Sequence, residues 1–167
     1  PTPQFAMLKT LDLRATDDPR DIIHRTVQAL VEGQVVGIPT DTVYGLAADA
    51  LSETAVEELV RLKGRQFDMP LAISVGSRES AEDFLCKSSP LVRRLSYRCW
   101  PGPLTLVASC ESPISALTQL PEVVRRQITG KFGCVGFRVV DHRVLSHIHR
   151  FLDRKSTRLN SSHRCIS

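Results

Sequence analysis

A short apolar run, Val35–Ile38, lies between two segments whose apolar residues recur at helical spacing, and this alternation limits the folds open to the chain. The preceding segment begins near Pro19 and ends at Gly33, while the following segment begins after Ser52 and ends at Gly64. Proline in the first turn and glycine just past the last turn are typical helix boundaries. The sequence therefore predicts a helix, a strand and a helix in succession, which is the pattern of an α/β domain.

The same alternation continues along the chain. Strands are expected over residues 71–75, 104–108 and 134–139, and helices over 80–85, 91–98 and 141–152, the last capped by Asp141. Short connections between such elements favour one domain with a mixed or largely parallel sheet. The residues expected on the inner faces of the three longest helices are Ile23, Val27, Leu30 and Val31, then Ala55, Val56, Leu59, Val60 and Leu62, and finally Val144, Leu145, Ile148 and Leu152.

Composition narrows the class of protein. The chain has 167 residues, enough for a single core, and no apolar run near the roughly 20 residues of a membrane helix. The first residues lack the pattern of a secretory signal, so we expect a cytoplasmic protein with no membrane contact. The five cysteines form no C-x-x-C pair, which favours reduced thiols over a zinc site. A net charge of +4 suits an anionic partner, either a nucleotide or RNA.

Small polar residues directly follow the Val35–Ile38 run. After Pro39, which ends the strand, come Thr40, Asp41 and Thr42. In open α/β sheets, ligands bind just beyond the carboxyl ends of strands, so these residues are candidates for a binding loop. A simple turn is the alternative explanation of the same residues.

Two further segments carry candidate site residues. Lys63-Gly64-Arg65 places two cations at the end of a helix, where they suit a polyphosphate, although a basic helix terminus is also favoured by the helix dipole alone. The segment Trp100–Thr105 has two prolines around Gly102 and leads into a predicted strand. It predicts a rigid loop, which could belong to a site or could be a structural corner packed by the indole.

Together these segments resemble the YrdC-like family of threonylcarbamoyl-AMP synthases. That family carries four ordered motifs, and all four have counterparts here. They are P-T-[DE]-T-x-Y-G-L at Pro39–Leu46, K-x-R-P with a following P-L at Lys63–Arg65 and Pro70-Leu71, W-P-G-P-[LF]-T at Trp100–Thr105, and V-x-x-R-x-P at Val135–Val139. The chain departs from two of them, because Gln66 and Val140 stand where the family has proline. The resemblance covers about residues 21–152.

The resemblance implies a fold and a reaction. The fold is a single-domain α/β structure with a twisted, open, mixed sheet, flanking helices and a concave basic surface. The reaction joins L-threonine, bicarbonate (or CO2) and ATP into threonylcarbamoyl-AMP and pyrophosphate. That product serves downstream tRNA threonylcarbamoyl-transfer proteins, and direct contact with tRNA or another RNA is a further expectation.

The resemblance also implies residue roles. Lys63 and Arg65 are expected to bind the ATP phosphates and the leaving pyrophosphate as the catalytic cations, and Thr42 and Arg138 to bind L-threonine. Thr105 is expected either to contact the nucleotide or to shape its loop. Mg2+ is expected to accompany ATP, without a metal site built by the protein. The residues expected to shape the loops are Thr40, Asp41, Tyr44, Trp100 and Gly102, with Asp41 favoured as a loop-orienting residue over a metal ligand.

The likeness ends near Leu152. Residues 1–152 are expected to form a YrdC-like domain that is incomplete at its C-terminal end, because the Ser/Thr-rich S-x-S-A-N segment of the family is missing. Residues 153–167 match the translation of a sequencing adapter and are expected to be either non-native or a disordered polar tail. Two other functions stay open: an RNA-binding module without synthase activity, and a carbamoyl-transfer domain of a larger enzyme.

Overall fold

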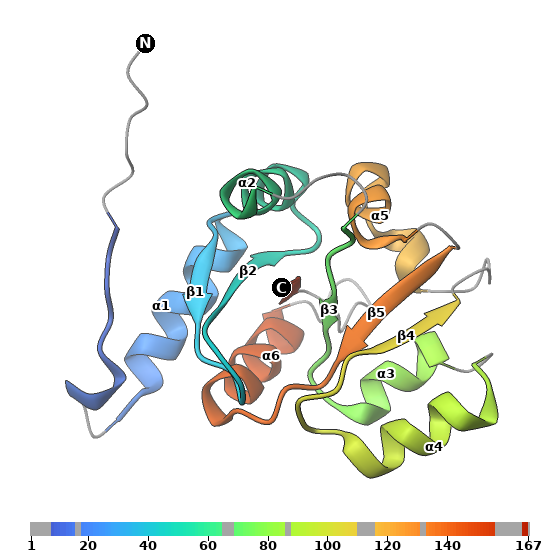
Figure 1. The fold of residues 1–167 in the computed structure, drawn as a ribbon. Helices are drawn as coiled ribbons and strands as arrows, with labels where there is room; N and C mark the ends of the chain where they lie inside the picture. The colour runs from blue at the N-terminus through green and yellow to red at the C-terminus, as the bar shows by residue number, and fades with distance from the viewer. Residues whose placement is uncertain are drawn as a thin grey trace.

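The structure is a computed structural model that describes residues 8–15, 18–64, 69–85, 88–109, 116–130, 133–155 and 165–166. Six strands and six α-helices, with two short 3-10 helices at Leu13–Ala15 and Ala116–Gln119, make up this part of the chain (Figure 1). The helices are α1 (Arg20–Val31), α2 (Glu53–Lys63), α3 (Arg78–Leu85), α4 (Pro90–Cys99), α5 (Glu122–Ile128) and α6 (Arg143–Lys155). The strands are β1 (Val36–Ile38), β2 (Gly45–Asp49), β3 (Ile73–Ser74), β4 (Leu106–Ser109), β5 (Cys134–Arg138) and β6 (Cys165–Ile166). None of the described helices is long and apolar enough to span a membrane.

The sheet has the strand order β1-β2-β6-β3-β5-β4. Within the described residues, β3 and β5 are the one parallel pair, with Ser74 opposite Arg138, and the other neighbours run antiparallel. The expectation of a mixed sheet is therefore confirmed, and the alternative of a largely parallel sheet is wrong. The reason is that two antiparallel pairs, β1–β2 and β4–β5, supply both edges of the sheet.

Strand β2 does not follow from the sequence pattern. Its Gly-Leu-Ala-Ala-Asp sequence is poor in the β-branched and aromatic residues that strands favour. The strand forms because it pairs antiparallel with β1, from Val36 opposite Ala47 to Ile38 opposite Gly45. Ala47 and Ala48 are fully buried, so small side chains here let the layers above and below the strand approach closely.

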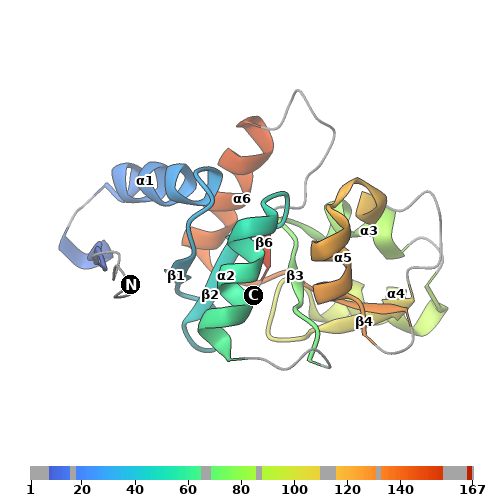
Figure 2. The ribbon, with the colours of Figure 1, turned by 90° about the horizontal axis from the view of Figure 1, so that it is seen from above.

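Two helices, α1 and α6, pack against each other and cover the β1–β2 end of the sheet (Figure 2). The core between them is built from apolar side chains at helical spacing, as expected, and is completed by residues of both strands: Ile23, Val27, Leu30, Ile38, Ala47, Val140, Leu145, Ile148 and Leu152. Val31 and Leu62 were expected on inner faces, yet 43% and 51% of their surface is exposed. Both lie at the last turn of their helices, where the apolar face turns away from the sheet.

The remaining helices enclose a second core. Helices α2 and α5 lie side by side across one end of the sheet, while α3 and α4 pair beside β4 (Figures 1 and 2). Phe137 of β5 is at the centre of this core with no exposed surface. Helix α5 was not expected, because a seven-residue segment is too short to show a periodic pattern.

The predicted boundaries of α2 are confirmed. The Ser52 hydroxyl accepts a hydrogen bond from the Ala55 amide at 3.3 Å, and Gly64 ends the helix in the left-handed region with φ 57°. The expected cap of α6 is wrong, because the helix begins at Arg143 and the Asp141 amide instead donates to a side chain of the β1–β2 loop.

Near the end of the chain, a short strand pairs with the sheet where an unpaired tail was expected. Helix α6 continues to Lys155, and Cys165 and Ile166 form β6 between β2 and β3, whereas the tail was expected to be unpaired. Strands β2 and β3 are not bonded to each other, so each presents an open edge toward the other. An extended segment of almost any sequence can pair with such edges through its backbone.

Candidate functional site

Arg138, at the end of β5, is the centre of a polar cluster. Its Nη2 donates to Asp41 Oδ1 at 2.5 Å and to Thr42 Oγ1 at 3.3 Å, and its Nε donates to the Gly102 carbonyl at 3.4 Å. The side chains of Arg138 and Asp41 are 19% and 11% exposed, so the ion pair is largely screened from water. The cluster therefore joins a strand end to two loops that are distant in sequence.

The fold explains why these groups meet. Strand β5 ends on the same side of the sheet as the connection between β1 and β2, and the chain passes from there into α6 (Figure 1). The second carboxylate oxygen of Asp41, Oδ2, accepts the Asp141 amide at 3.3 Å. One carboxylate thus joins the β1–β2 loop to the end of β5 and to the segment just before α6.

The β1–β2 loop is held in shape by Thr40. Its Oγ1 accepts the amides of Thr42 and Val43, both at 3.2 Å, and lies 2.6 Å from the Val43 carbonyl. Such a side-chain turn explains why Thr40 precedes the polar pair. Tyr44 is 80% exposed, so its ring shapes no packed part of the loop.

The Trp100–Thr105 segment forms the other wall of the cluster. The Trp100 indole is 5% exposed and donates from Nε1 to the Leu104 carbonyl at 2.6 Å. A side chain at Gly102 would come within 2.6 Å of the Cys99 carbonyl, so the turn requires glycine. The Gly102 amide donates to Val139 O at 2.8 Å, which places the Gly102 carbonyl beside Arg138. The segment is thus both a structural corner and part of the site.

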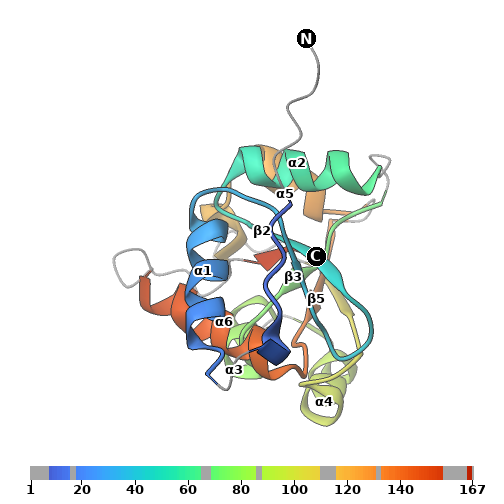
Figure 3. The same ribbon diagram turned by 90° about the vertical axis from the view of Figure 1, so that its left-hand side faces the viewer.

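The other expected site residues lie apart from this cluster or outside the described residues. Lys63 is half-buried at the end of α2, and that end projects toward the same side of the molecule as the β1–β2 loop (Figures 2 and 3). Arg65 lies outside the described residues. Thr105 is exposed and borders Gly136 of β5, where an added Cβ would be 3.2 Å from the Thr105 methyl. The expected roles of these residues stay predictions.

The donors of Arg138 are only partly used. Nε and Nη2 are committed, whereas Nη1 has no hydrogen-bond partner within the part of the chain that the structure describes. A planar guanidinium held on one edge can bind a carboxylate or phosphate with its free nitrogen. Among these residues there is also no group of three or more His, Cys, Asp or Glu side chains that could hold a metal ion.

A buried pair behind the cluster was missed by sequence reasoning. Ser74, opposite Arg138 on β3, lies 2.9 Å from His149 Nε2 of α6, and both residues are 3% exposed. Burial lowers the pKa of His149 to about 4, so the imidazole is neutral at pH 7. Its position four residues after Leu145 and three before Leu152 places it on the buried face of α6, which is the signal that could have identified it.

Comparisons with known proteins identify the family of this chain. The Sua5_yciO_yrdC family model, described as "Telomere recombination", matches residues 28–163. The chain is 42% identical over 113 residues to the threonylcarbamoyl-AMP synthase of Pyrococcus abyssi, covering 68% of the chain and 30% of the relative. It is 33% identical over 131 residues to the Bacillus subtilis synthase, covering 78% and 35%. The chain thus spans about a third of the length of these two relatives.

Solved structures give the same family. The P. abyssi Sua5 structure complexed with L-threonine matches with a TM-score of 0.66 and 31% identity, over 86% of this chain and 36% of that one. Escherichia coli YciO matches with a TM-score of 0.71 over 89% of this chain and 63% of that one, and at 17% identity it supports the fold alone. With the family model matching most of its length, this chain belongs to the Sua5/YciO/YrdC family.

Proposed function

We propose that this chain forms L-threonylcarbamoyl-AMP and pyrophosphate from L-threonine, bicarbonate or CO2, and ATP, as a nucleotidyl-transferring enzyme of tRNA modification. The observation that carries the proposal is the uncommitted Nη1 of Arg138 beside the Thr42 hydroxyl. It is supported by relatives named threonylcarbamoyl-AMP synthase and by the L-threonine complex of P. abyssi Sua5.

Arg138 and Thr42 would bind L-threonine. Asp41 and the Gly102 carbonyl fix two nitrogens of the guanidinium, so that Nη1 can donate to the substrate carboxylate without reorganising. The Thr42 hydroxyl is exposed next to it and can bond the substrate's amine or hydroxyl. Asp41 offsets the charge of Arg138, which makes the site selective for a zwitterionic amino acid over a bare anion.

Lys63 and Arg65 would bind the triphosphate. Lys63 ends α2 on the side of the molecule toward which the β1–β2 loop projects (Figure 3). A nucleotide could then lie with its phosphates toward α2 and its α-phosphorus toward bound threonine. Mg2+ would enter bound to the ATP phosphates.

The chemistry needs mainly positioning. The threonine amine adds to CO2 and loses a proton, and a carbamate oxygen then attacks the α-phosphorus. The bond from this phosphorus to the bridging oxygen breaks, and pyrophosphate leaves with the electron pair. Lys63 and Arg65 would hold the leaving pyrophosphate, and Arg138 would hold the carboxylate of threonine. Such positioning reduces the entropy cost of bringing three substrates together. The product is to be passed to tRNA threonylcarbamoyl-transfer proteins, with the reaction taking place in the cytoplasm.

The test is pyrophosphate release measured with each substrate omitted in turn. Release is expected only when threonine, bicarbonate and ATP are all present. Arg138→Lys keeps a positive charge beside Asp41 but replaces the three guanidinium nitrogens with a single ammonium nitrogen. We therefore expect the KM for threonine to rise at least tenfold, while the KM for ATP changes less than threefold. The matched control is Arg93→Lys, at an exposed position of α4.

Two results would count against the proposal. If Arg138→Lys leaves the KM for threonine unchanged, the residue does not bind that substrate. If pyrophosphate release needs no threonine, while the chain binds RNA with an affinity that falls steeply with salt, the RNA-binding module is the better description.

A further inference from the structure

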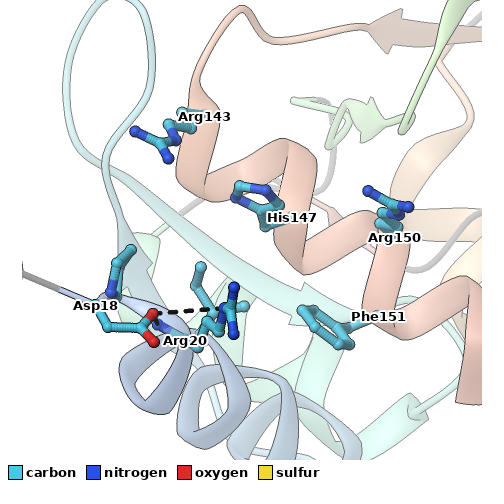
Figure 4. A pocket seen from close by; sticks show the side chains of 8 residues that line it. Asp18, Arg20, Arg143, His147, Arg150 and Phe151 are labelled. Atoms are coloured by element: carbon cyan, nitrogen blue, oxygen red, sulfur yellow. Dashed lines mark hydrogen bonds and ion pairs between the residues drawn. The ribbon is translucent and has the colours of Figure 1, made fainter.

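A cavity of about 510 Å³ lies between α1 and α6, outside the site described above. Its lining combines three arginines with an apolar wall (Figure 4). The arginines are Arg20, Arg143 and Arg150, and the other lining residues are Asp18, Pro19, Ile23, His147 and Phe151. Volumes of roughly 300–1,000 Å³ are typical of small-molecule sites.

The cations of α6 form one stripe along the helix. Arg143, His147 and Arg150 are spaced four and three residues apart, which places them on one side of α6, and all three line the cavity (Figure 4). No acidic residue occurs in the sequence from 143 to 150. Among the side chains that the structure describes, no carboxylate lies within 4.0 Å of Arg143 or Arg150, whereas Arg20 pairs with Asp18 at 3.7 Å. Two unneutralised guanidinium groups at one cavity suit an anionic ligand, phosphate in particular.

The cavity also has an apolar part, made by residues near the start of α1 and by Phe151 of α6 itself. Pro19 and Ile23 of the α1 end supply aliphatic surface, and Phe151 supplies an aromatic ring. That ring is held edge-to-face against His24, with 4.6 Å between the ring centroids. A fixed aromatic ring beside arginines is the combination that binds the base and the phosphate of a nucleotide.

We propose that the cavity between α1 and α6 is a second nucleotide site, with the phosphate at Arg143 and Arg150 and the base against Phe151. A single nucleotide is favoured over an RNA strand because the cations and the apolar wall line one cavity and do not form a track along the surface. The site is separate from the Arg138 cluster, although α6 begins only two residues after Asp141, whose amide is bonded to Asp41.

The test follows the imidazole signals of the whole chain by proton NMR during titration with AMP. His147 lines the cavity, whereas His149 faces β3 and is buried, so the second histidine is an internal control. We expect the His147 signal to shift saturably and the His149 signal to stay in place. Adenosine, which lacks the phosphate, is expected to bind at least tenfold more weakly.

Substitutions distinguish AMP binding in this cavity from AMP binding elsewhere on the chain. Arg143→Gln with Arg150→Gln is expected to weaken the His147 response at least tenfold, while Arg93→Gln with Arg94→Gln, the same charge change on exposed α4 positions, leaves it intact. The response is also expected to survive Lys63→Ala. The proposal is overturned if AMP leaves His147 unshifted, if the shift persists without the two α6 arginines, or if only a single-stranded oligoribonucleotide produces it.

Discussion

The buried imidazole of His149 makes the stability of the domain depend on pH. Its Nε2 lies 2.9 Å from Ser74 Oγ, while its Nδ1 is buried without a hydrogen-bond partner among the described residues. Protonation would place a positive charge in the core between α6 and β3. Burial accordingly lowers the pKa of His149 from 6.5 to about 4.

The sign and size of the effect follow from that shift. Between pH 6.5 and pH 4 the unfolded chain binds a proton at this position that the folded chain does not bind. The free energy of unfolding therefore falls as the pH is lowered through this window, and the contribution is fully present above pH 6.5. At about 1.4 kcal/mol per pH unit, the loss is about 2 kcal/mol between pH 6.5 and 5, and about 3 kcal/mol by pH 4.

Urea unfolding followed by circular dichroism at pH 7.5, 6.5, 5.5 and 5.0 measures this dependence. His149→Gln keeps a hydrogen-bonding group toward Ser74 but cannot be protonated, and other titrating groups contribute equally to both proteins. The difference in unfolding free energy between the natural chain and the variant should therefore shrink by about 2 kcal/mol from pH 6.5 to 5. Parallel pH profiles for the two proteins would refute the reasoning.

Two other perturbations test the packing around the site. Gly76→Ala places a methyl group 3.0 Å from the Cβ of His149, so the free energy of unfolding measured in urea titrations should fall by about 1–3 kcal/mol. The control is Gly37→Ala, where the added Cβ has no atom within 4 Å, and this variant should change the free energy of unfolding by less than about 1 kcal/mol. Equal effects of the two substitutions would contradict the close approach of Gly76 to His149. Trp100→Phe keeps most of the apolar surface but removes the 2.6 Å bond to Leu104 O, so thermal unfolding should show a loss of about 1 kcal/mol, and an unchanged melting temperature would argue against that bond.

The long helices could be predicted from sequence because local physics specifies them. Ser52 and Gly64 bound α2 as capping chemistry requires, and the inner faces of α1 and α6 follow the 3.6-residue period. Four strands, β1, β3, β4 and β5, were located from the sequence, but their ends were not, and β2 and β6 were not expected at all. Residues 71–75, for instance, give a strand of only two residues, Ile73–Ser74, since strand ends depend on neighbours distant in sequence.

In the site, too, the features set by neighbouring residues could be predicted, and those set by residues distant in sequence could not. The β1–β2 loop was identifiable because small polar residues follow an apolar run and Pro39. Its partner was not, because Arg138 is 97 residues from Asp41, and nothing in either segment specifies the other. The resemblance to a family placed Thr42 and Arg138 in one threonine site, but it did not predict the ion pair between Asp41 and Arg138. The resemblance favoured for Asp41 a role in orienting the loop over one in binding metal, and in the structure its carboxylate pairs with Arg138.

Strand β2, which the sequence pattern did not reveal, determines whether this site can exist. Its register with β1, ending at Ile38 opposite Gly45, reverses the chain so that residues 39–44 project beyond the sheet toward the end of β5. Asp41 then holds Arg138 with one oxygen and the start of α6 with the other. Since the partners come from β1–β2, β5 and α6, the cluster forms only when these elements have packed together. A ligand bound to Arg138 therefore stabilises the assembled domain as a whole, because no partly folded form would retain the site.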